Sequence, residues 1–130
     1  MAVFTSTTGP VLNGSETGVR AQFVRLLISN DAVTDFASIE ISVFAIDDNS
    51  VNTPKVPLAR QAFSLSPSSV TNRTIPVSGF PIYEVQLSVT TPNPNIEVVV
   101  TTVGVDAGGK IVDNQQYLYT ELTTIPALTP

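Results

Sequence analysis

The sequence predicts an all-β protein, a two-sheet antiparallel sandwich of jelly-roll or Ig-like topology with an extended N-terminal arm. Three observations support this. Apolar and polar residues alternate with a period of two in nearly every segment, and clusters of turn-forming residues interrupt them at intervals of roughly ten to fifteen residues. No segment has a convincing helical period, and β-branched residues are abundant. At 130 residues the chain is long enough for one domain.

Seven segments have the pattern of strands. In chain order they are residues 22–29, 38–47, 56–65, 70–77, 82–90, 95–105 and 111–122. The clearest is IYEVQLSVT (82–90), in which every second residue from Tyr83 to Val89 is apolar and should face the core. In residues 38–47 both faces carry apolar side chains, since Phe44 and Ile46 alternate with Val43 and its neighbours. We therefore expect both faces of that strand to be covered.

The connecting segments are rich in Gly, Pro, Asn, Asp and Ser. They are residues 47–54, 66–69, 78–81, 91–95 and 106–110. Gly108 and Gly109 can adopt positive φ at little cost, so the last two strands should form a hairpin across them.

The N-terminal segment, residues 1–18, is expected to be an arm. Its first fifteen residues carry no charged side chain, and its bulky apolar residues after Met1 are Val3, Phe4, Val11 and Leu12. An extended, uncharged segment of this kind can add a strand to the sheet edge of a neighbouring subunit. The alternatives are a disordered terminus or an eighth strand on the chain's own sandwich.

The rest of the chain divides into a sandwich domain, residues 19–122, and an apolar tail, residues 123–130. Ile125 and Leu128 lie between prolines in this tail, and we expect them to cover a groove on the same molecule or on a neighbour.

The composition excludes several classes of function. Charged residues make up 13% of the chain, and hydrophobic residues make up 42%. The net charge of −5 argues against nucleic-acid binding, which requires a basic surface. No apolar run is long enough to cross a bilayer, so membrane insertion is not expected. Without His or Cys, the catalytic pairs Ser–His and Cys–His cannot form, and we expect no enzyme activity.

The charged residues offer no convincing catalytic or metal site, and we expect no cofactor. Alternation places Glu84 on the outward face of its strand, where a solvated side chain is the simplest interpretation. Asp47, Asp48 and Asn49 form the sole acidic cluster, but they lack the ligand spacing of an EF-hand and favour a polar turn. Lys55 lies in a turn-like segment and reads as a solvated lysine.

Two aromatic residues near the end of the last strand, Tyr117 and Tyr119, share one face. Buried tyrosines usually hydrogen-bond through the hydroxyl group, so these residues favour a domain or subunit contact over a stacking platform for a ligand.

The hairpin VVVTTVGVDAGGKIVDNQQYLYTEL (98–122) is similar to the closing strands of spore-surface sandwich proteins. Together with its size and arm, the chain resembles the Ena-type fibre subunits of bacterial endospore appendages. That resemblance implies subunits that stack into fibres, with residues 1–18 as a connector between neighbours. Family members use connector cysteines for cross-links, whereas this chain has none.

We therefore expect a structural subunit that assembles non-covalently with copies of itself into an extracellular or spore-surface fibre. Strand edges and the N-terminal arm would make the contacts. No segment reads as a signal peptide, which suggests release by lysis. The alternatives are a virion shell or tail subunit and a monomeric glycan- or protein-binding module. Such a module would use loops 47–54 and 91–95 or the Tyr117–Tyr119 face.

Overall fold

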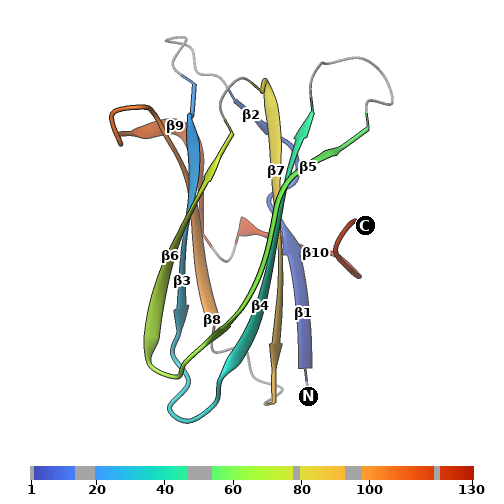
Figure 1. Cartoon of the computed structure of the whole chain (residues 1–130), viewed down its shortest axis with the longest axis vertical. Helices are drawn as coiled ribbons and strands as arrows, with labels where there is room; N and C mark the ends of the chain where they lie inside the picture. Colours follow the sequence, from blue (N-terminus) through green and yellow to red (C-terminus); the bar gives the residue numbers. More distant parts are fainter. Residues whose placement is uncertain (1, 14–19, 47–53, 78–79, 93–97, 119–120) are drawn as a thin grey trace.

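The computed structural model describes residues 2–13, 20–46, 54–77, 80–92, 98–118 and 121–130, without the side chains of residues 113 and 114. Its strands form two antiparallel sheets (Figure 1). Sheet A has the order β10 (Thr123–Thr124), β1 (Ala2–Thr7), β7 (Ile82–Thr91), β4 (Ala37–Ile46) and β5 (Val56–Leu65), and β2 (Val11–Leu12) also pairs with β7. Sheet B has the order β6 (Ser69–Pro76), β3 (Phe23–Asn30), β8 (Val98–Val105) and β9 (Ile111–Leu118).

These two sheets pack face to face, which confirms the predicted all-β sandwich. Successive described strands mostly lie in different sheets: the chain crosses between the sheets from β2 to β3, β3 to β4, β5 to β6, β6 to β7, β7 to β8 and β9 to β10. Within the sheets, β4 pairs with β7 near the centre of sheet A, and β3 pairs with β8 at the centre of sheet B.

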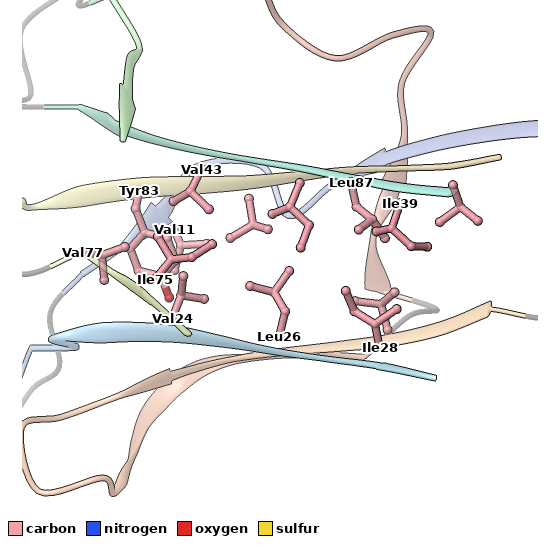
Figure 2. Close-up of a cluster of buried hydrophobic side chains, with 14 of the residues drawn as sticks. Val11, Val24, Leu26, Ile28, Ile39, Val43, Ile75, Val77, Tyr83 and Leu87 are labelled. Carbon is pink, nitrogen blue, oxygen red and sulfur yellow. The ribbon is translucent and has the colours of Figure 1, made fainter. Parts of the chain in front are cut away.

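The core lies between these central pairs (Figure 2). Val24, Leu26 and Ile28 project from β3 toward Ile39 of β4 and Leu87 of β7, and all five side chains are buried. Alternation in the sequence placed Leu87 on the inward face of its strand, and this is confirmed. Phe44 and Ile46, on the opposite face of β4, are also buried, which confirms that both faces of this strand are covered.

A series of buried polar side chains, linked by hydrogen bonds, connects the two sheets near one end of the sandwich. The Tyr83 hydroxyl donates to Gln115 Oε1 at 2.7 Å, and Gln115 Nε2 donates to Asn13 Oδ1 at 3.2 Å. Asn13 also bonds the backbone of Ala21 in both directions. Burial, together with the nearby Tyr117, raises the pKa of Tyr83, so its hydroxyl stays a neutral donor. These hydrogen bonds connect β7 of sheet A to β9 of sheet B.

The predicted hairpin at Gly108 and Gly109 is confirmed. β8 and β9 are antiparallel, and Gly109 has a φ of +83°. Its amide donates to the Asp106 carbonyl at 3.0 Å, and the Asp106 amide donates to the Lys110 carbonyl at 2.8 Å. Glycine is needed here because few L-residues adopt this backbone conformation.

The prediction of a separate N-terminal arm (residues 1–18) is wrong for residues 2–13, the part of it that the structure describes. β1 pairs with β7 of its own chain from Ala2 opposite Thr91 to Thr7 opposite Gln86, and β2 continues along the same strand. The segment is therefore an additional strand of its own sandwich, the alternative that the sequence left open. The edge of β7 opposite β4 would otherwise be unpaired, and a strand on the same chain reaches it at high effective concentration.

The C-terminal tail also lies on sheet A, beside β1 (Figure 1). β10 pairs with Ser6 and Thr7 of β1, and the Ile125 amide donates to the Thr5 carbonyl at 2.9 Å. Residues 123–130 therefore pack on the sandwich of their own chain, and their predicted separation from the domain is wrong. Among the described residues, no helix is long and apolar enough to span a membrane.

Gly104 of β8 lets the buried side chain of Gln115 lie close to the β8 backbone. A Cβ atom at this position would lie 2.4 Å from Gln115 Oε1 and 3.1 Å from the Ala21 Cβ. We expect Gly104→Ala to lower the free energy of unfolding by about 1–3 kcal/mol, because buried neighbours would have to move. Urea denaturation measures this. Gly108→Ala is the matched control, since its nearest atom would lie at 3.4 Å, an ordinary contact. Equal stability of the two variants would contradict this assignment of the Gly104 contact.

Candidate functional site

The outer face of sheet B is largely apolar, and much of it is exposed, although Val103 and Val105 of β8 are buried on it. Its register places side chains in rows across the four strands: Leu118, Thr101, Leu27 and Asn72 form one row, and Ile111, Val105, Phe23 and Pro76 form another. The exposed large apolar residues of this face are Phe23, Leu27, Val70, Val99, Ile111 and Leu118. We call these six residues the apolar face. Leu27, at the centre of the sheet, is 41% exposed, and Val70 is 65% exposed.

Charge is nearly absent from this outer face. Of its described residues, which lie at alternate positions of β3, β6, β8 and β9, Arg25 alone is charged. The chain as a whole has eleven acidic and six basic residues. Two of the described carboxylates lie beside this face: Asp31 accepts a hydrogen bond from Ser29 Oγ, and Glu121 accepts one from the Leu118 amide. Antiparallel sheets of monomeric proteins usually have a polar outer face, and a large exposed apolar patch marks an interaction surface.

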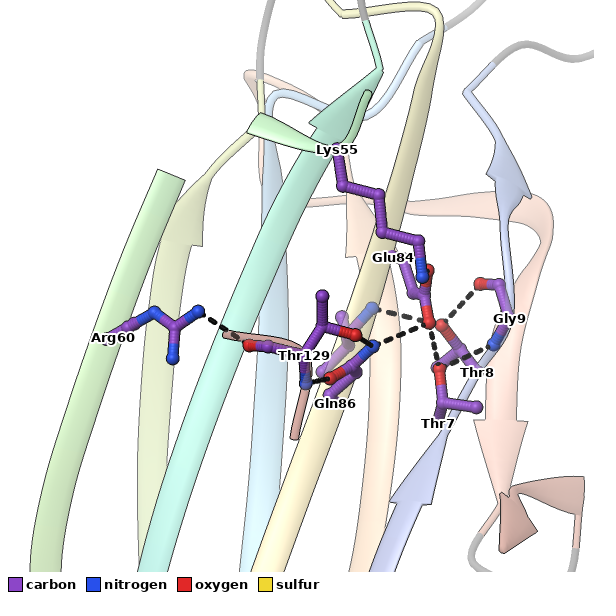
Figure 3. A network of polar contacts seen from close by, with 9 residues as sticks. Thr7, Thr8, Gly9, Lys55, Arg60, Glu84, Gln86 and Thr129 are labelled. Carbon is purple, nitrogen blue, oxygen red and sulfur yellow. Dashed lines mark hydrogen bonds and ion pairs between the residues drawn. The ribbon is translucent and has the colours of Figure 1, made fainter. Parts of the chain in front are cut away.

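The outer face of sheet A differs, because a buried carboxylate lies at its centre (Figure 3). Glu84 of β7 is 2% exposed and accepts a hydrogen bond from Thr7 Oγ1 at 2.5 Å and one from Gln86 Nε2 at 3.0 Å, both at Oε2. Lys55 Nζ lies 2.7 Å from Oε1. We call Thr7, Lys55, Glu84, Gln86 and Thr129 the Glu84 cluster.

Thr129 closes this cluster from the C-terminal end of the chain. Its amide donates to Gln86 Oε1 at 2.8 Å, and its hydroxyl accepts from Gln86 Nε2 at 2.9 Å. Its carbonyl accepts from Arg60 Nη2 at 2.6 Å. The Arg60 and Lys55 cations lie 5.6 and 5.9 Å from the centre of the Phe44 ring, which is buried on this face. Both ends of the chain therefore meet at β7.

Opposing effects set the ionisation of Glu84. Burial raises its pKa, but the hydrogen bonds from Lys55, Thr7 and Gln86, with the charge of Lys55, together lower the pKa below its ordinary value of 4.5. The carboxylate is therefore ionised at neutral pH. A buried charge is tolerated only when it is paired and hydrogen-bonded, and this carboxylate has both kinds of partner.

The structure places the residues that the sequence selected as contacts in different environments. Val11 is buried and Phe4 is half-buried, whereas Val3 and Leu12 are exposed. Tyr117 is half-buried and packs against the core. Ile125 and Leu128 are also half-buried, and Tyr119 lies outside the described residues. These side chains are not gathered into one site.

Sequence reasoning missed the Glu84 cluster. It placed Glu84 on the outward face correctly, but the interpretation of Glu84 as a solvated side chain is wrong. Lys55 is exposed, as the sequence suggested, but its ion pair with Glu84 was not predicted. The acidic cluster at residues 47–49 lies outside the described residues. Within the described part of the chain, no group of three or more potential metal ligands is close enough to hold an ion.

Comparison with known proteins adds little to this description. No family model matches the chain, and the curated proteins gave no match. Among solved structures, the chain is similar to the crystal structure of Thermotoga maritima 1070, with 17% sequence identity and a TM-score of 0.49. The alignment covers 93% of this chain and 90% of that chain.

Glu84 should make stability depend on pH in the acidic range. Because its pKa is lower in the folded than in the unfolded chain, its contribution is complete above the unfolded pKa and is lost as pH falls through the folded pKa. We expect the midpoint of urea denaturation to fall on acidification below about pH 4.5. The fall should be shallower in Glu84→Gln. Glu40→Gln is the control, since Glu40 is exposed. Parallel curves for wild type and Glu84→Gln would contradict this role.

Proposed function

We propose that the protein is a non-enzymatic structural subunit that assembles with copies of itself, and that the apolar face of sheet B is its main contact. The observation that carries this proposal is the exposure of six large apolar side chains on a face with a single described charge. A second copy is the favoured occupant because Arg25 is the one charged side chain among the described outward residues of these strands, so that two copies of this face bring few charges together.

The size of the face indicates how strong one contact can be. Four strands spaced about 4.8 Å apart, each with eight residues rising about 3.3 Å, give a face of about 500 Å². Stable interfaces bury about 800 Å² on each partner. One face-to-face contact is therefore weak by itself, and a durable assembly needs a second kind of contact that repeats along it.

The free part of the β1 edge can supply that second contact. β10 covers Ser6 and Thr7, and Ile125 bonds Thr5, so Ala2, Val3 and Phe4 have no ladder partner on that side among the described residues. Strand edges of this kind accept another strand. Edge pairing extends an assembly within the plane of sheet A, whereas face packing stacks one sheet B on another. The two contacts together join many copies into a fibre.

The resemblance to endospore appendage subunits, noted from the sequence, agrees with a fibre on the surface of a spore or cell. Because β1 belongs to its own sheet, docking of an N-terminal arm on a neighbour is not part of this proposal.

Leu27→Glu tests the apolar face. A carboxylate buried at a contact between copies is costly, and about 1.4 kcal/mol already corresponds to a tenfold change in association. We expect the concentration needed for assembly to rise at least about tenfold by sedimentation velocity, with loss of polymers in negative-stain micrographs.

Ser64→Glu is the matched control, because Ser64 is exposed on the outer face of sheet A. Assembly of Leu27→Glu at the wild-type concentration would exclude this face as the contact. A wild-type chain that stays monomeric at all concentrations would overturn the assembly function and would favour a monomeric binding module.

A further inference from the structure

We propose that Thr7 and Gln86 become joined by an internal ester bond, formed by the chain itself within the Glu84 cluster. Thr7 Oγ1 attacks the side-chain carbonyl carbon of Gln86, and ammonia leaves. This modification is independent of the assembly proposed above. It would fix the N-terminal strand β1 to β7 covalently in a chain that has no cysteine.

The two reacting residues are held opposite each other. Thr7 of β1 and Gln86 of β7 are direct partners in the antiparallel ladder, and both side chains lie on the outer face of sheet A. The Cβ atoms of such partners are about 4.5–5.5 Å apart, a separation that an ester between these side chains can span. Their proximity replaces a bimolecular encounter with a reaction inside one folded molecule.

Glu84 can serve as both base and acid. Its Oε2 atom accepts the Thr7 hydroxyl proton at 2.5 Å and the Gln86 amide at 3.0 Å (Figure 3). One oxygen therefore touches the nucleophile and the leaving group. Since Lys55 helps to keep the carboxylate ionised, Oε2 is free to take the hydroxyl proton as the attack begins.

The electrophilic carbon is also prepared for attack. The Thr129 amide donates to Gln86 Oε1 at 2.8 Å, and this is the oxygen that becomes negative in the tetrahedral intermediate. A backbone donor already placed at that oxygen stabilises the developing charge.

The reaction balances without an added reagent. The Thr7 Oγ1–H bond and the Gln86 Cδ–Nε2 bond break, and an Oγ1–Cδ bond forms. The Thr7 proton passes through Glu84 to Nε2, which departs as ammonia, and no oxidation state changes. Gln86 is 1% exposed and Thr7 is 7% exposed, so water is excluded from the product ester.

Thr129 is the rival nucleophile, but its geometry is less suitable. Its hydroxyl accepts a hydrogen bond from Gln86 Nε2 and so engages the leaving group. The Thr7 hydroxyl instead donates its proton to a carboxylate. Variants at the two threonines can distinguish these possibilities.

Intact-mass spectrometry of the full chain tests the proposal. After incubation at neutral pH, we expect a mass lower than that of the sequence by one ammonia, about 17 Da. Trypsin should then release residues 1–20 joined to residues 74–110, since cleavage follows Arg20, Arg73 and Lys110. Hydroxylamine, which cleaves esters, should separate the two peptides.

In Thr7→Val and in Glu84→Gln, residues 1–20 and 74–110 should not be joined. Thr5→Val is the matched control, because Thr5 is buried on the same face of β1 but contacts Ser88 Oγ in place of a carboxylate. It should lose ammonia as the wild type does.

Asn13-Gly14 can also lose ammonia, by forming a cyclic imide. The joined peptides distinguish the ester from this reaction, since the imide leaves residues 1–20 unlinked. A wild-type chain that keeps its full mass, or a link between residues 1–20 and 74–110 that persists in Thr7→Val, would overturn the proposal. Peptides linked through Thr129 would do so as well.

Discussion

Burial of β7 on both of its faces is the constraint on which the rest of the structure depends. Its inward side chains, from Tyr83 to Val89, form part of the core, and its outward residues Glu84 and Gln86 are also buried. A carboxylate in this position requires partners, because an unpaired buried charge costs several kcal/mol, about 3–5 when one partner of a pair is removed. Those partners come from β1 and from the residue before β5, and Gln86 recruits the C-terminal tail. The position of both chain ends therefore follows from the polar outer side of one central strand.

Alternation in the sequence predicted the face of each residue well but not whether that face is covered. The predicted strand at 56–65 coincides with β5, and the other six differ from their observed counterparts mainly at their ends. Glu84 and Gln86 were correctly placed outward. Their burial depends on Lys55 and Thr129, which are far away in the chain, and a period of two contains no information about such segments.

The N-terminal segment shows a different limit of sequence reasoning. Gly9 and Pro10 separate β1 from β2. Gly9 has a φ of +67°, which lets the chain turn between two short pieces that pair with the same strand. β2 has two residues, and β1 has two threonines among its six residues, so neither piece has a clear apolar face. The partner strand decides its location, and that partner is some eighty residues away in the sequence.

Placing both ends on sheet A leaves the two outer faces of the sandwich with different properties. The tail and Lys55 cover polar and aromatic groups on sheet A, whereas the apolar side chains of sheet B remain exposed. A second copy that packs on sheet B would therefore leave the Glu84 cluster untouched, and a covalent link between β1 and β7 would leave the apolar face unchanged. The two effects would nevertheless reinforce each other in a fibre. Pulling on an assembled subunit would load the strands nearest its edges, and β1 is held mainly by one ladder to β7. An ester at Thr7 would lie near the C-terminal end of that ladder, so that β1 could not leave the sheet without breaking a covalent bond.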